Sequence, residues 1–64
     1  MVQWVVFYHG EQELAAFTLR GMFPGEIRAT IDLLAGELGL PESAVSVSRQ
    51  DRPLHSPKGG DLNE

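Results

Sequence analysis

The chain has 64 residues and no cysteine, so it is at most one small domain without a disulfide framework or a thiolate metal site. Nine acidic and five basic side chains give a net charge of -4, which opposes binding to phosphate backbones. The longest apolar run is far shorter than the roughly 20 residues of a membrane-spanning helix, and no basic segment typical of a signal peptide precedes it. We therefore expect a cytoplasmic protein that does not associate with membranes.

Two strand-like segments open the chain. Residues 2–8 (VQWVVFY) contain no charge, glycine or proline and are rich in β-branched and aromatic side chains, which favour a strand. Residues 13–20 (ELAAFTLR) alternate loosely between polar and apolar types and predict a second strand. Gly10 supplies the positive φ of a tight turn, which is formed either by His9 and Gly10 (type I′) or by Gly10 and Glu11 (type II′).

Both turns predict the same two faces for this hairpin, because side chains alternate along each strand. The larger apolar face carries Val2, Trp4, Val6, Ala15, Phe17 and Leu19. The other face has polar residues at its margin and an apolar centre made of Val5, Phe7, Leu14 and Ala16. We expect a helix to cover the larger face, which leaves the second centre as the candidate partner-binding patch.

The next segment has helical periodicity. Ile27, Ile31, Leu34 and Leu38 step by four, three and four residues, as on one side of an amphipathic helix. Pro24 suits the first helical turn. A glycine at position 39, followed closely by a proline, predicts the end of the helix.

A third strand follows the helix. Residues 44–49 (AVSVSR) alternate cleanly, and a crossover through the helix places this strand beside the first strand and antiparallel to it. The expected fold is therefore α+β: a two-layer ββαβ domain over residues 1–50, with strand order 2-1-3 and one helix on one face. Residues 51–64 contain few large apolar side chains, and we expect them to form a disordered tail.

The chain carries little that resembles a catalytic or metal site. His9 falls at the hairpin turn and His55 in the expected tail, so the two histidines do not form a zinc constellation. No serine stands in a nucleophile motif, and no glycine pattern matches a phosphate-binding loop. We expect no catalytic residue, no metal, no cofactor and no small-molecule ligand.

One resemblance covers roughly residues 2–49. The residues that carry it are Ala15–Gly21, Phe23, Gly25 and Glu26, and Leu33–Glu37. They resemble small uncharacterised proteins carried on conjugative or other integrative elements of Gram-positive gut bacteria. This resemblance implies a cytoplasmic accessory role in a mobile element and transfers no activity to any residue.

Three functional hypotheses follow from the sequence. The first is a non-enzymatic interaction module that forms a homodimer or binds a protein partner, through the uncovered sheet face or through the edge strands. The second is an acidic inhibitor or nucleic-acid mimic, suggested by the negative net charge. The third is a nucleic-acid binder that uses Arg20, Arg28 and Arg49, against which the same net charge argues.

Overall fold

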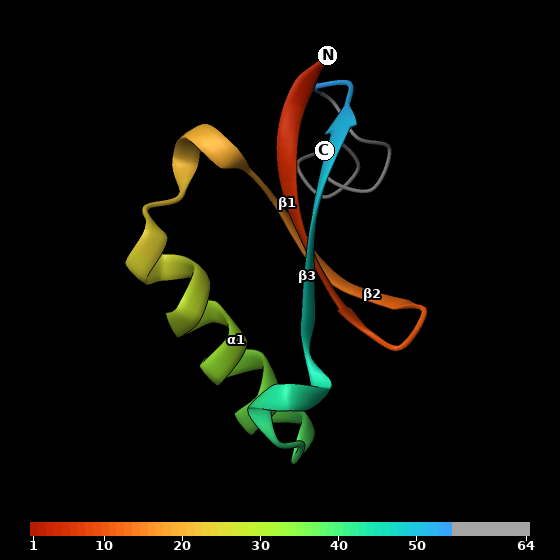
Figure 1. The fold of residues 1–64 in the computed structure, drawn as a ribbon, viewed down its shortest axis with the longest axis vertical. Coiled ribbons are helices and arrows are strands. Elements are labelled where there is room, and N and C mark those ends of the chain that lie inside the picture. Colours follow the sequence, from red (N-terminus) through yellow and green to blue (C-terminus); the bar gives the residue numbers. More distant parts are fainter. Residues whose placement is uncertain (55–64) are drawn as a thin grey trace, which may run out of the picture.

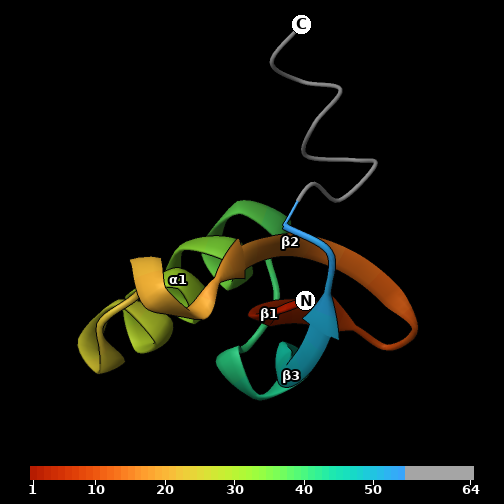
Figure 2. The same ribbon diagram turned by 90° about the horizontal axis from the view of Figure 1, so that it is seen from above.

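The computed structural model describes residues 1–54, which form an open three-stranded sheet with one helix packed on one face (Figure 1). The strand order is β2-β1-β3, and both outer strands are antiparallel to β1, so that β2 and β3 lie on opposite sides of it (Figure 2). The predicted α+β fold with strand order 2-1-3 is confirmed. The elements are β1 (Val2–His9), β2 (Gln12–Thr18), η1 (Leu19–Gly21), α1 (Pro24–Leu38), η2 (Glu42–Ala44) and β3 (Ser46–Arg52), where η denotes a single 3₁₀ turn.

Two strand boundaries differ from the prediction. Leu19 and Arg20, which we expected in the second strand, belong to η1. β3 begins at Ser46 and continues to Arg52, so Asp51 and Arg52 pair with β1 although we placed them in the tail. The last part of the predicted tail, residues 55–64, lies outside the described residues.

The hairpin between β1 and β2 contains a tight turn and a bulge. His9 pairs with Gln12 across the loop, and Gly10 has φ +64° while no other residue of the loop has a positive φ, which fits the type II′ alternative. The register then shifts by one residue, because Tyr8 pairs with Glu13 but Phe7 pairs with Ala15. Leu14 is the extra residue of this β-bulge.

The bulge reverses the face that we predicted for β1, while Ala15 and Phe17 of β2 lie on the helix side as predicted. Val5 and Phe7 are 1% and 0% exposed and lie under α1 in the main core cluster, together with Ala35 and Val45. The shifted register puts Phe17 opposite Val5, and the rings of Phe7 and Phe17 meet edge to face with centroids 6.1 Å apart. We call this side of the sheet the helix-side face.

The expectation that Trp4 lies under the helix is therefore wrong. Trp4 and Val6 point to the opposite side of β1, which no described helix covers and which we call the open face. They are nevertheless only 8% and 0% exposed. The open face is therefore not an exposed apolar surface at its centre.

The ends of α1 follow the sequence signals. At the start, the Phe23 N–H donates to the Glu26 carboxylate at 3.1 Å. The Phe23 side chain has no oxygen that could accept a hydrogen bond from the Glu26 N–H, so only half of a capping box forms. At the end, Gly39 adopts the left-handed conformation with φ +70°. The Leu40 N–H donates to the Ala35 carbonyl at 2.9 Å, which completes a Schellman motif.

We predict that Phe7→Ala destabilises the fold by about 3–5 kcal/mol, since it opens a cavity beneath α1. The matched control is Phe23→Ala, which removes the same group from a side chain that is 73% exposed and should change stability by less than about 0.5 kcal/mol. Urea unfolding followed by circular dichroism measures both. Equal effects of the two substitutions would show that Phe7 is not a core residue.

Candidate functional site

The predicted partner-binding patch does not exist as a surface. Val5 and Phe7 are fully buried beneath α1, and the bulged Leu14 packs against the same core. Ala16 pairs with Val6 and lies on the open face instead. The four residues are therefore divided between the two faces. Three of them belong to the core or pack against it, so they do not form the exposed apolar patch that we expected.

The edge strands, which the sequence also indicated, are present in the structure. All seven residues of β3 pair with β1 without a register shift. Among the described strands, none pairs with the other side of β3. Its outward N–H and C=O groups therefore form a regular row along one edge of the sheet.

The helix-side face of β3 carries two opposite charges close to this edge. Arg49 and Asp51 are exposed, and they lie on the same face because they are two residues apart. Within residues 1–54, neither side chain makes a hydrogen bond or an ion pair. We expected the strand to end at Arg49 and therefore missed Gln50 and Asp51, because the residues after Val47 are all polar and show no alternation.

A polar network crosses the open face and joins all three strands. The Gln50 amide donates to the Tyr8 hydroxyl at 2.7 Å, and Arg52 donates to the Gln50 amide oxygen and to the Glu13 carboxylate, each at 2.9 Å through Nη2. The bond to Glu13 raises the pKa of the Arg52 guanidinium. These side chains share the face with Trp4 and Val6, which are buried, so this side of the sheet combines a polar network with two buried apolar residues.

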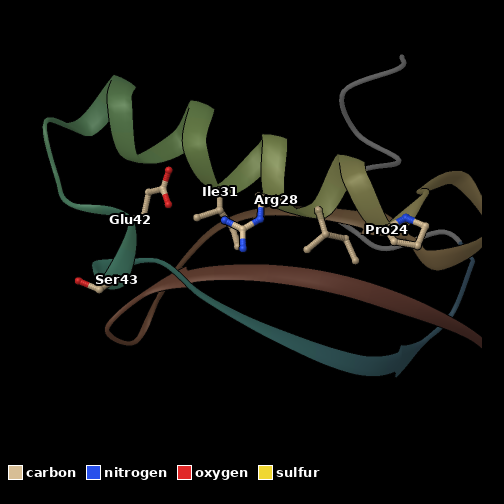
Figure 3. A pocket seen from close by; sticks show the side chains of 6 residues that line it. Pro24, Arg28, Ile31, Glu42 and Ser43 are labelled. Atoms are coloured by element: carbon tan, nitrogen blue, oxygen red, sulfur yellow. The ribbon is translucent and has the colours of Figure 1, made fainter.

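A pocket of about 460 Å³ lies between α1 and η2, lined by Pro24, Ile27, Arg28, Ile31, Glu42 and Ser43. Figure 3 shows Arg28 and Ile31 extending from α1 on the side that faces the strands, while Glu42 comes from η2. A side-chain hydrogen bond and charge repulsion from Asp32 raise the pKa of Glu42, and Arg28 partly opposes this shift. The pocket holds one guanidinium and one carboxylate, which offset each other, and offers no nucleophile with a partnering base.

A second groove, of about 350 Å³, separates the end of β2 from α1. Phe17 and Leu33 line it and are 43% and 62% exposed. Met22 and Ala29 complete its apolar wall. This groove offers apolar contact area but no pattern of charge that would identify a partner.

The remaining candidate residues belong to separate elements. Arg20, Arg28 and Arg49 stand on η1, α1 and β3, and Arg28 is close enough to Glu42 to affect its titration. His9 is exposed at the end of β1, and His55 lies outside the described residues. Residues 1–54 contain no group of three or more potential metal-binding side chains, and none of their helices has the length and apolarity to cross a bilayer.

We predict that Arg52→Met lowers the stability by about 1 kcal/mol, because the aliphatic stem is kept while the hydrogen bonds to Glu13 and Gln50 are lost. Arg20→Met is the control, since Arg20 is exposed, lies away from β3 and has no side-chain partner among the described residues, so the change should cost less than about 0.5 kcal/mol. The midpoint of urea unfolding measures both. An equal loss in the two variants would show that the network does not stabilise the fold.

We predict a pH-dependent effect of Glu42→Gln. Because the pKa of Glu42 is raised in the folded state, the folded protein holds this proton more tightly than the unfolded chain does. The resulting stabilisation is complete below the ordinary glutamate pKa of about 4.3. It is lost as the pH rises through the raised pKa. Glu42→Gln should therefore raise the melting temperature slightly at pH 7 and leave it unchanged in acid. Glu37→Gln, which removes one negative charge from α1 rather than from η2, is the control. A lower melting temperature of Glu42→Gln at pH 7 would contradict the repulsion from Asp32.

Comparison with known proteins adds no family to this geometry. None of the family models, curated proteins or solved structures compared with the chain matches it. The resemblance to proteins of mobile elements therefore stays a prediction.

Proposed function

We propose that the chain is a small non-enzymatic interaction module that forms a homodimer through the outer edge of β3. One observation carries the proposal: β3 is paired along its whole length on one side, without a bulge, and has no described strand on the other. Such an edge is a template for another strand, because each outward N–H and C=O can bond to a neighbour.

The two edges of the sheet differ in a way that supports β3. The bulge at Leu14 interrupts the pairing of β2 and disturbs the geometry of that edge. Neither strand contains a proline or a lysine, which are residues that commonly block strand addition, so the bulge is what distinguishes the two edges. Val47 is 38% exposed on this strand and adds apolar area beside the edge.

The small core gives the chain a reason to associate. Six hydrophobic residues are buried in the described structure, and they belong to β1, α1 and the segment before β3. A chain of 64 residues buries only about 60% of the surface that its unfolded state exposes, and small domains often gain further burial by oligomerisation. Extension of the sheet across two copies would supply it.

The two alternative functions have less support. Nucleic-acid binding through Arg20, Arg28 and Arg49 would require them to act together, but they stand on three different elements and the net charge is -4. An acidic inhibitor would need a dense row of carboxylates. The pair formed by Asp32 and Glu42 has Arg28 as a neighbour, which reduces its negative field.

Backbone N-methylation tests the proposal without changing any side chain. Consecutive residues of a strand point their N–H groups to opposite sides, so either Arg49 or Gln50 directs its N–H to β1 and the other to the free edge. Two synthetic chains, each N-methylated at one of these positions, should therefore behave differently. One should lose its fold, and the other should stay folded but fail to dimerise.

Circular dichroism reports the fold of both chains, and sedimentation equilibrium over a range of concentrations reports their mass. The unmethylated chain should approach the mass of two copies as its concentration rises. A monomer at every concentration, or a folded edge-methylated chain that dimerises as well as the unmethylated one, would refute dimerisation through this edge.

A further inference from the structure

We infer that two β3 strands pair antiparallel about Gln50, so that Arg49 of each copy faces Asp51 of the other. The inference rests on the proposed dimerisation through β3 and specifies its register. It predicts a six-stranded sheet in the order β2-β1-β3-β3-β1-β2. Both α1 helices would lie on the same side of this sheet, because the symmetry preserves the face of each residue.

Symmetry restricts the choice of register. A two-fold axis between antiparallel strands runs perpendicular to the sheet, and it leaves every side chain on its own face. A residue can therefore stand opposite only a residue of the same face, and one residue at the axis stands opposite its own copy. The central residue is one of the five interior residues of β3. A centre at Val47 puts Arg49 opposite Val45 and forms no ion pair, which leaves Ser48, Arg49, Gln50 and Asp51.

The charges of β3 distinguish these four registers. A centre at Arg49 puts two guanidinium groups opposite each other, and a centre at Asp51 does the same with two carboxylates. Like charges directly opposite each other destabilise a strand pair. A centre at Ser48 puts Arg49 opposite Val47 and forms no ion pair.

Only a centre at Gln50 pairs opposite charges. Arg49 then lies opposite Asp51 of the second copy, and the symmetry repeats this ion pair on the other side of the axis. Ser48 lies opposite Arg52, which is held on the open face by Glu13. The sequence Arg49-Gln50-Asp51 is thus complementary to itself when it is read in the opposite direction.

The structure leaves these charges available for such contacts. Arg49 and Asp51 are both exposed, and neither side chain has a hydrogen bond or ion pair within residues 1–54. Arg52, by contrast, is engaged by Glu13 across the open face. The dimer would therefore use side chains that are free in the single copy and would leave the network intact.

Charge reversal tests the register. Arg49→Asp would place acidic side chains opposite each other, and Asp51→Arg would do the same with basic ones. Each variant alone should weaken the homodimer at least about tenfold. An equimolar mixture should form a heterodimer, because every acidic residue then faces a basic one, and the double variant with both changes should recover the homodimer.

Native mass spectrometry separates these species by mass, and sedimentation equilibrium gives their dissociation constants. Asp51→Arg replaces a negative by a positive side chain and changes the net charge from -4 to -2. Two copies of this variant therefore repel each other less overall, and this reduced repulsion alone would strengthen self-association. A weaker dimer therefore supports the specific pairing. Arg20→Asp and Glu11→Arg carry the same charge changes away from β3 and should form no preferred heterodimer.

The neutral variants Arg49→Gln and Asp51→Asn keep the test valid if a charge reversal prevents folding, and each should weaken the homodimer by a smaller factor. The register about Gln50 is wrong if the charge-reversed and neutral variants all dimerise as tightly as the original chain. It is also wrong if Arg49→Asp and Asp51→Arg form no heterodimer when they are mixed. Either result leaves edge pairing through β3 intact. A monomeric original chain would instead refute the proposed dimer itself.

Discussion

The single extra residue at Leu14 determines how the two sides of the sheet are built. Without it, the tight turn at Gly10 would pair β1 and β2 so that Phe17 shared a face with Trp4. With it, Phe17 shares a face with Phe7, and their rings meet under α1. Because the side-chain period of a strand is two, a shift of one residue exchanges the faces of everything that follows.

The order of elements and the limits of α1 could be predicted, because they depend on local signals. Periodic apolar residues located the helix, and Gly39 ended it in the left-handed conformation that glycine permits. The faces of the hairpin could not be predicted in the same way. The only hint of a bulge is the run of four apolar residues from Leu14 to Phe17, which breaks the alternation but does not say which residue is extra.

The open face was beyond prediction because its contacts join distant parts of the chain. Tyr8 and Gln50 are 42 residues apart, and Glu13 and Arg52 are 39 residues apart. No local pattern indicates that these polar side chains meet on the same side as Trp4 and Val6. Counting apolar residues therefore favoured Trp4 as the core aromatic. In the structure, both sides of β1 are buried, one under α1 and the other on the face that the network crosses.

The same bulge also distinguishes the two edges of the sheet. It moves Phe17 to the helix-side face and at the same time breaks the regular hydrogen-bond spacing of β2. β3 needs no such adjustment, because its register against β1 is constant from Ser46 to Arg52. The bulge that completes the core thus disfavours strand addition at β2 and leaves β3 as the regular edge. On β3, Arg49 and Asp51 are exposed beside the outward backbone groups. The core and the proposed dimer interface are therefore connected through one backbone irregularity, although they lie on different strands.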